Sequence, residues 1–413
     1  MTYNTSLASR TSRMGASAIR EILKVVSAPG MVSLAGGIPA KESFPMDIME
    51  ELFTRVIRRY GSSAFQYDLT EGFPPLREAL VPFLAERGIH TDAKNILVTT
   101  GSQGVLDGIA KILISPGDGI AVEAPTYLGA IQAFNPYEPR YVRMETDEEG
   151  VIPESLEAVL QRGQVKFVYL VPTFQNPTGK TLSLKRREEI AQIICRHNAL
   201  LVEDDPYSML RYRGEPLPPI YTFAPENTLY ISTLSKVFAP GLRIGFFLAP
   251  PPLDRWLVLA KQGVDLHTST LNQALAAEYI SGGYLHRQVP RIVSLYAPRQ
   301  QAMLEAMEKY FPSSFSWTNP EGGMFVWAEG PKELDLEQVY YRAIERNVAY
   351  VPGKFFFTEP GEGMSTMRLN FTCSEPSTLE KAIRTLGEVL AESIDTKQGT
   401  LDRAEKARRV HVL

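Results

Sequence analysis

Short apolar runs and longer amphipathic stretches alternate between residues 47 and 285. The apolar runs are rich in β-branched residues and stand at 95–100, 119–124, 166–172, 199–205, 229–233 and 244–250. Stretches between them, such as 104–113 and 184–198, have the apolar spacing of helices. Strands that are buried on both faces of a parallel sheet read as continuous apolar runs. The pattern therefore predicts a large α/β domain at 47–285, with a mostly parallel sheet and helices on both faces.

The pattern changes after about residue 285. A long helical stretch at 293–311 precedes an apolar run at 322–329, another helix and a strand at 367–372. We expect residues 286–391 to form a smaller α+β domain. Residues 1–46 are predicted to be an N-terminal arm and segment, and residues 392–413 a polar tail. A chain of 413 residues is long enough for two domains.

Composition narrows the classes of function. The formal net charge of −4 gives no overall basic footprint for nucleic acid. The two cysteines, Cys195 and Cys373, suit neither a zinc site nor a disulfide framework, which favours a reduced, cytoplasmic setting and no metal. The first residues lack the apolar core of a secretory signal, and no apolar run is long enough to cross a bilayer. We therefore expect neither a nucleic acid nor a membrane as partner.

Lys236 follows an apolar strand that ends in hydroxyl residues, and a second apolar run begins soon after it. A lysine chosen at random is a surface charge, but one between two buried strands is costly without a function. Desolvation lowers the pKa of such an amine and makes it nucleophilic toward an aldehyde. Thr233, Ser235 and Arg243 are residue types that hold a phosphate dianion. The segment is therefore a candidate for covalent chemistry beside a phosphate.

Three acids in a row, Glu203, Asp204 and Asp205, end another buried strand. Ligands of α/β proteins bind at the carboxyl ends of such strands. A carboxylate there can keep a pyridine nitrogen protonated, which makes the ring an electron sink. Solvated acids at a strand end are the ordinary alternative. The residues alone do not choose among the three.

Four more segments follow strands or precede helices. Asn176 begins an Asn-Pro-Thr-Gly turn, and its amide can donate to a phenolic oxygen. Residues 101–104, Gly-Ser-Gln-Gly, open a helix whose first N–H groups can bind phosphate. Tyr127 can stack on a flat ring, and Tyr67 lies in a polar loop before a helix. Each segment read alone is equally compatible with an ordinary turn or loop.

Arg368 stands inside an apolar strand of the smaller domain, where a charged residue needs a partner. It can pair with an internal acid or bind a substrate carboxylate through both nitrogens. Gly36 and Gly37 permit a close backbone approach. Arg20 lies on a predicted helix near the N-terminus, where a surface position is the simple interpretation.

Taken in order, these segments resemble the class I/II, fold-type I aminotransferases that use pyridoxal 5′-phosphate (PLP), from about residue 17 to 390. The matching motifs are SLAGGIP, QYDLTEG, TTGSQG, EAPTY, NPTG, DDPY, SK with the arginine that follows, and MRLNF. Within the class the chain looks most like the α-aminoadipate and kynurenine aminotransferases. The resemblance implies a homodimer and an N-terminal segment associated with the small domain and the substrate.

The resemblance also implies roles for individual residues. Lys236 would form the Schiff base with PLP and move the proton, Asp204 would pair with the pyridine nitrogen, and Tyr207 would bond the phenolic oxygen with Asn176. Tyr127 would stack on the ring, and Tyr67 would reach the phosphate of the neighbouring subunit. The phosphate would be held by Ser102, Gln103, Thr233, Ser235 and Arg243. The substrate would be bound by Arg368, Asn176, Gly37 and Arg20.

The expected reaction is a ping-pong transfer of an amino group from an L-amino acid to a 2-oxo acid such as 2-oxoglutarate. The amino acid would be 2-aminoadipate, an aromatic or a branched-chain one. Two alternatives stay open at this point. One is a lyase or decarboxylase on the same fold, and the other is a non-catalytic PLP-binding regulator. About 16 residues precede the matching region, which are too few for a DNA-binding domain.

Overall fold

A computed structural model describes residues 6–14 and 30–410, and the side chains of the last helix as far as residue 396. The described residues fall into two compact units. The first unit is built mainly from Pro39–Ser294 and Pro320–Gly323. The second unit is built from Leu295–Asn319, from the chain from Met324 onward and from the short strand β1 (Val32–Ser33). One long helix, α10 (Tyr284–Tyr310), contributes to both units.

A seven-stranded sheet in the order β2-β10-β9-β8-β7-β3-β4 forms the centre of the first unit. Its strands are β2 (Leu97–Thr100), β3 (Gly119–Glu123), β4 (Arg140–Met144), β7 (Val165–Leu170), β8 (Leu201–Asp205), β9 (Thr228–Thr233) and β10 (Ile244–Leu248). All neighbours are parallel except β10, which is antiparallel to both β2 and β9. The predicted α/β domain with a mostly parallel sheet is confirmed.

The buried strands account for the apolar runs of the sequence. Every residue of β3, β8, β9 and β10 is buried. Strand β4 lies at the edge of the sheet and is only partly buried, with the mixed sequence RYVRM. Because an edge strand does not need to be apolar on both faces, the pattern of apolar runs did not predict it.

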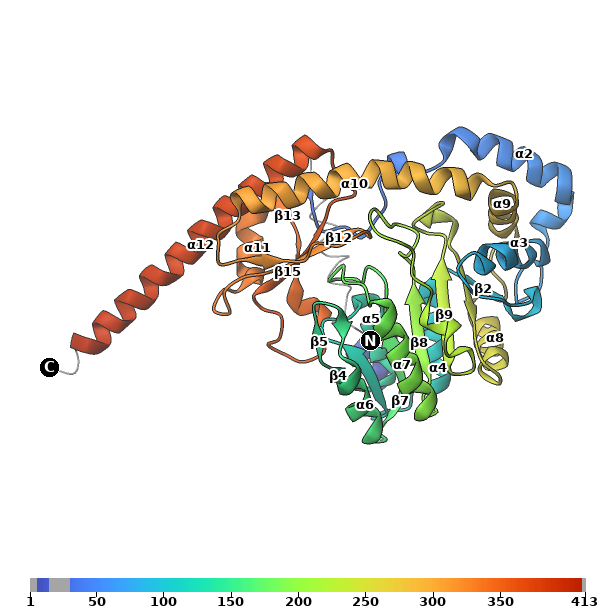
Figure 1. Cartoon of the computed structure of the whole chain (residues 1–413), viewed down its shortest axis with the longest axis horizontal. Helices are drawn as coiled ribbons and strands as arrows, with labels where there is room; N and C mark the ends of the chain where they lie inside the picture. The colour runs from blue at the N-terminus through green and yellow to red at the C-terminus, as the bar shows by residue number, and fades with distance from the viewer. Residues whose placement is uncertain (1–5, 15–29, 411–413) are drawn as a thin grey trace. The chain divides into compact units, whose positions relative to one another are not determined.

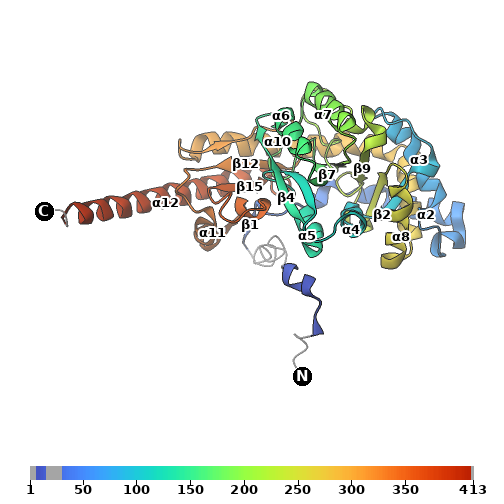
Figure 2. The same cartoon turned by 90° about the horizontal axis from the view of Figure 1, so that it is seen from below.

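Helices cover both faces of this sheet. Figure 2 shows α6 (Pro153–Gln161) and α7 (Leu184–Arg196) on one side, and α4 (Ser102–Leu113), α5 (Leu128–Phe134) and α8 (Leu253–Asp265) on the other. The remaining helices of this unit are α2 (Met49–Tyr60), α3 (Pro74–Ala85) and α9 (Thr270–Ser281) (Figure 1). A small hairpin pairs β5 (Thr146–Asp147) with β6 (Gly150–Val151).

The second unit contains a four-stranded antiparallel sheet in the order β11-β12-β15-β14. Its strands are β11 (Ser316–Trp317), β12 (Phe325–Glu329), β14 (Val351–Pro352) and β15 (Thr366–Asn370). A separate parallel pair joins β1 (Val32–Ser33) to β13 (Val348–Ala349). Among its described residues, the unit also contains the helices α11 (Leu336–Glu345) and α12 (Pro376–Val410). Helix α12 continues past residue 391, where the sequence predicted a polar tail to begin.

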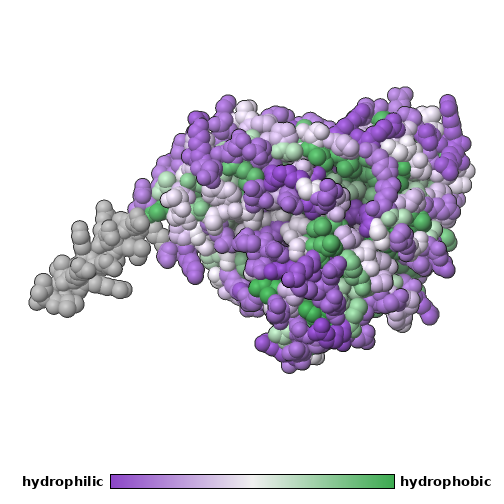
Figure 3. Space-filling model, viewed as in Figure 1, coloured by the Kyte–Doolittle hydropathy of each residue, from purple (hydrophilic) through white to green (hydrophobic). Residues whose placement is uncertain are grey.

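Among the described helices, none combines the length and the hydropathy needed to cross a membrane. On the face drawn in Figure 3, hydrophilic residues cover most of the surface and apolar residues appear as separate patches.

Candidate active site

A pocket of about 210 Å³ lies in the first unit, where β7, β8 and β9 end. In parallel sheets this end collects the loops that follow the strands, so residues far apart in sequence meet there. All of the predicted cofactor-binding residues except Tyr67 line the pocket: Ser102, Gln103, Tyr127, Asn176, Asp204, Tyr207, Thr233, Ser235, Lys236 and Arg243.

Lys236 lies three residues beyond the end of β9, and its Nζ is 6.0 Å from the centre of the Tyr207 ring. The turn that carries it is fixed by local hydrogen bonds. The hydroxyl of Thr233 donates to the carbonyl of Ile244 at 2.8 Å and accepts from the backbone N–H of Ser235 at 3.2 Å. The lysine backbone is therefore held in place, while its long side chain lines the pocket.

Strand alternation separates the three acids of β8, because successive side chains point to opposite faces of a sheet. Glu203 accepts from the backbone N–H groups of Ile220 at 2.9 Å and Tyr221 at 2.8 Å. Burial raises the pKa of Glu203 to about 7, against the positive charge of Arg187 and these two amides. Glu203 therefore anchors the segment that precedes β9 and does not line the pocket.

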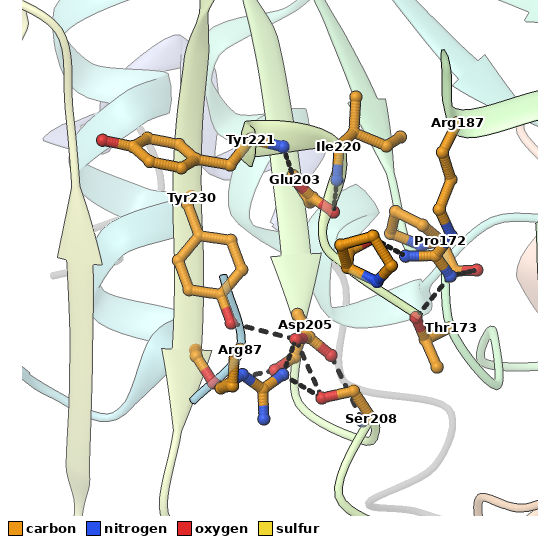
Figure 4. A network of polar contacts seen from close by, with 12 residues as sticks. Arg87, Pro172, Thr173, Arg187, Glu203, Asp205, Ser208, Ile220, Tyr221 and Tyr230 are labelled. Atoms are coloured by element: carbon orange, nitrogen blue, oxygen red, sulfur yellow. Dashed lines mark hydrogen bonds and ion pairs between the residues drawn. The ribbon is translucent and has the colours of Figure 1, made fainter. Parts of the chain in front are cut away.

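Asp205 lies on the same face as Glu203 and is held in a polar network (Figure 4). It accepts from the hydroxyl of Tyr230 at 2.9 Å, from the backbone N–H of Ser208 at 3.2 Å and from the hydroxyl of Ser208 at 2.9 Å. The guanidinium of Arg87 donates to both Asp205 and Ser208. The carboxylate of Asp205 therefore stabilises the fold and does not line the pocket.

Asp204 faces the other way and lines the pocket. Its side chain is 2% exposed, and its Oδ2 accepts from the hydroxyl of Tyr169 at 2.9 Å. Its Oδ1 is buried and has no hydrogen-bond partner among the described residues. Burial raises the pKa of Asp204 to about 7, while the Tyr169 hydrogen bond acts in the opposite direction and the charge of Asp205 adds to the rise. Buried polar atoms are nearly always bonded, so this oxygen requires a donor.

The helix start at residues 101–104 and the guanidinium of Arg243 meet at another side of the pocket. Gly101 is the N-cap of α4 with φ +74°, a conformation that favours glycine. A Cβ at this position would lie 2.1 Å from Nη2 of Arg243. The Nη2 atom also donates to the carbonyl of Thr100 at 3.4 Å. Helix N–H groups, a guanidinium and the hydroxyls of Ser102 and Ser235 form a binding site suited to a phosphate dianion.

The polar groups of Asn176 and Tyr207 face each other, with Asn176 Nδ2 donating to the Tyr207 hydroxyl at 3.3 Å. Both residues are nearly fully buried, at 4% and 5% exposed. Tyr127 directly precedes α5 and lines the same pocket. A Cβ at Gly129 would lie 2.4 Å from the Tyr127 ring, so the glycine leaves room for that ring.

The remaining predicted residues lie elsewhere. Tyr67 is 76% exposed in the first unit, with its ring edge-on to His267 at 5.6 Å. Arg368, in the second unit, is fully buried, donates to the carbonyl of Ala35 at 2.7 Å and stacks over Phe325 at 4.2 Å. A Cβ at Gly37 would lie 3.9 Å from Nη2 of Arg368, so this glycine is beside the arginine.

Arg20 lies outside the described residues. Within the described part of the chain, no group of three or more His, Cys, Asp or Glu side chains is placed to hold a metal ion.

Sequence reasoning missed several residues of the site. Val171, Pro206 and Pro240 line the pocket. Tyr169 does not line it, but its hydroxyl donates a hydrogen bond to the catalytic candidate Asp204. The prolines and the valine carry no chemical signal in a sequence. Tyr169 does carry one, since its hydroxyl stands in an otherwise apolar strand and must find a partner when buried.

Comparison with known proteins decides the family. The sequence profile described as "Aminotransferase class I and II" matches residues 30–386. The chain belongs to this family. An aromatic-amino-acid aminotransferase from Thermococcus litoralis is 44% identical over 399 residues, which are 95% of each chain. A 2-aminoadipate transaminase from Thermus thermophilus is 39% identical and covers 94% of this chain and 98% of its own.

Solved structures agree with this family assignment. The α-aminoadipate aminotransferase LysN from Thermus thermophilus, in complex with N-(5′-phosphopyridoxyl)-L-leucine, superimposes with a TM-score of 0.89 at 38% identity. The match covers 96% of this chain and all of that one. The protein is therefore a PLP-dependent aminotransferase of the aminoadipate/kynurenine subgroup with the type I fold. The lyase and decarboxylase alternatives are not favoured.

Proposed function

We propose that this aminotransferase uses Lys236 as the lysine that binds PLP, and transfers amino groups from 2-aminoadipate, aromatic or branched-chain amino acids to 2-oxo acids such as 2-oxoglutarate. The observation that carries the assignment of the site is the buried Asp204 Oδ1, which has no partner among the residues that the structure describes. It lines the same pocket as Lys236, Arg243 and the first turn of α4. An amine, a buried acid and a phosphate-binding site together suit PLP, which when bound provides an electron sink for charge at the substrate Cα.

Each polar residue of the pocket is assigned to one part of the cofactor or to proton transfer. Ser102, Gln103, Ser235 and Arg243 would hold the phosphate, and Thr233, whose hydroxyl bonds Ile244 and Ser235, would line the site and fix the turn beside it. Asp204 holds a proton on the ring nitrogen, while Asn176 and Tyr207 bind the phenolic oxygen and Tyr127 packs on the ring. Lys236 would hold the cofactor through its amine, and its Nζ would move the proton between the substrate Cα and C4′. General acid–base catalysis by a positioned group typically contributes about 10²–10⁴-fold.

The substrate range rests on the relatives and on Arg368. The Thermococcus litoralis relative is named for aromatic amino acids, and the Thermus thermophilus one for 2-aminoadipate. Arg368 presents a planar guanidinium, the group best suited to a carboxylate. We assign it the substrate α-carboxylate, and we assign Gly37 and Asn176 to substrate binding as well. A second carboxylate on the substrate side chain would be met by Arg20.

We also propose that the enzyme is a homodimer in which Tyr67 completes the phosphate site of the neighbouring subunit. The large exposure of Tyr67, beside His267, supports this role, because Tyr67 is not one of the residues that line the pocket of its own chain. We place the enzyme in the cytoplasm, because Cys195 and Cys373 form no disulfide.

Absorbance spectroscopy of the purified PLP-loaded protein tests the function directly. Single amino acids are added in turn, and 2-oxoglutarate is then added to each converted sample. We expect the bound-PLP band to convert to a pyridoxamine-like band with 2-aminoadipate, aromatic or branched-chain amino acids, and to return with 2-oxoglutarate. A band that no amino acid converts would refute the proposed reaction.

Borohydride reduction followed by peptide mass spectrometry tests Lys236. We expect the phosphopyridoxyl mass on the peptide that contains Lys236, and its loss in Lys236→Ala together with turnover. Lys166→Ala is the control, because Lys166 lies on β7 away from the pocket and its side chain is 52% exposed. Labelling of another lysine would overturn the assignment.

A further inference from the structure

Strands β7 and β8 place a tyrosine beside the acid of the site. They are parallel, and Tyr169 is in register with Val202. Paired side chains of neighbouring strands share a face, so Tyr169, Val202 and Asp204 all face the same side. The hydroxyl of Tyr169 donates to Asp204 Oδ2 at 2.9 Å, and the two side chains are 0% and 2% exposed.

The Tyr169 ring is fixed by its packing. The ring of Phe134, also fully buried, meets it edge-on at 5.8 Å with an interplanar angle of 86°. Burial raises the pKa of Tyr169 well above its ordinary value, and the negative charge of Asp204 adds to this rise. Both effects favour the protonated hydroxyl, which is the form that donates to Asp204.

A carboxylate has two oxygens, and here they have different environments. Oδ2 is occupied by Tyr169, and Oδ1 is buried without a partner among the described residues. With one oxygen fixed, rotation of the carboxylate would break the Tyr169 hydrogen bond. The hydrogen bond also favours the charged form of Asp204, against the burial that disfavours it.

We propose that Tyr169 is a positioning residue that acts through Asp204: its hydroxyl holds Oδ2, so that Oδ1 is presented to the pocket as a charged acceptor. The inference rests on the proposed role of Asp204 toward the ring nitrogen of PLP. Tyr169 does not line the pocket, so it would influence proton transfer only through Asp204.

A double-mutant cycle on the PLP-loaded enzyme tests this inference. The variants are Tyr169→Phe, Asp204→Asn and the two combined, with kcat, KM and bound PLP measured for each. We expect Tyr169→Phe to bind PLP and to lower kcat about 10- to 100-fold, the scale of a hydrogen bond to a charged group, with little change in KM. The double variant should be no slower than Asp204→Asn, because Tyr169 has nothing left to position.

A buried tyrosine elsewhere provides the control. Tyr350 is fully buried in the second unit, and its hydroxyl donates to the carbonyl of Leu336 at 2.5 Å. Tyr350→Phe removes a comparable hydroxyl, so kcat should stay near that of the wild type. Phe134→Leu is a second route to the same test if Tyr169→Phe does not fold. It loosens the ring without removing the hydroxyl, and its loss of kcat should vanish in the Asp204→Asn background.

The outcomes separate the two proposals. Near-native kcat in Asp204→Asn would overturn the proposed role of Asp204, and this inference with it. A slow Asp204→Asn beside a near-native Tyr169→Phe would overturn this inference alone. So would a double variant whose loss of kcat is the product of the two single losses, because Tyr169 would then act independently of Asp204.

Discussion

Arg87 supplies the charge that balances a carboxylate buried directly behind the site. Its side chain is 13% exposed and that of Asp205 is 4% exposed, so the ion pair is largely desolvated. Arg87→Met removes the guanidinium and keeps much of the length of the side chain. The substitution leaves Asp205 in the interior without its charged partner.

The structure sets the size of the expected loss. Breaking a buried ion pair by removing one partner typically costs about 3–5 kcal/mol. Asp205 keeps the hydroxyl of Tyr230 and both donors of Ser208, so we expect the lower end, about 3 kcal/mol. Adding Asp205→Asn removes the unpaired charge, and the double variant should recover about 1–2 kcal/mol of that loss.

Urea unfolding followed by circular dichroism measures these differences in the free energy of unfolding. Arg291→Met is the control, because Arg291 and its partner Asp47 are 63% and 57% exposed at 3.0 Å. An exposed pair contributes about 0–1 kcal/mol. A loss below about 1 kcal/mol in Arg87→Met, or a double variant less stable than the single one, would refute the reasoning.

Three further predictions concern the site. Gly101→Ala should weaken PLP binding at least about tenfold, because the new Cβ displaces Arg243. The control Gly117→Ala, with φ +88° and no atom within 4 Å, should leave PLP binding unchanged. Equilibrium dialysis compares the PLP affinities of the two variants. Stability without PLP should fall as pH rises from about 4 to about 7, because the folded pKa of Asp204, about 7, exceeds the ordinary 3.8 and the folded state binds the extra proton. Asp204 contributes at most about 1.4 kcal/mol per pH unit to this slope, beside Glu203 and Glu123, whose pKa values burial raises to about 7 and about 8. Urea titrations should therefore show a slope smaller by up to that amount in Asp204→Asn. Arg368→Lys should raise KM for the amino acid about tenfold or more, since lysine lacks the planar fork, and steady-state kinetics with two amino acids would show an unchanged KM if the assignment is wrong.

Much of the first unit could be predicted because burial constrains composition locally. A parallel strand covered on both faces must be apolar throughout, so the runs at 119–124, 199–205 and 229–233 match β3, β8 and β9 closely. Strand β4 escaped the prediction because an exposed edge carries no such constraint. Helix α12 continues beyond residue 391 into the segment whose polar composition predicts a tail.

The sequence alone, through the order of its motifs, predicted four features that follow buried strands: a lysine, a carboxylate, an amide and the start of a helix. It did not determine which acid of β8 serves the site. Alternation places Asp204 opposite to Glu203 and Asp205, but the face that meets the pocket depends on strand order and on the loops that close it. Only the tertiary structure shows Arg87 beside Asp205 and Tyr169 beside Asp204. These partners lie 118 and 35 residues away in sequence, and no local pattern encodes a contact made by the packing of distant segments.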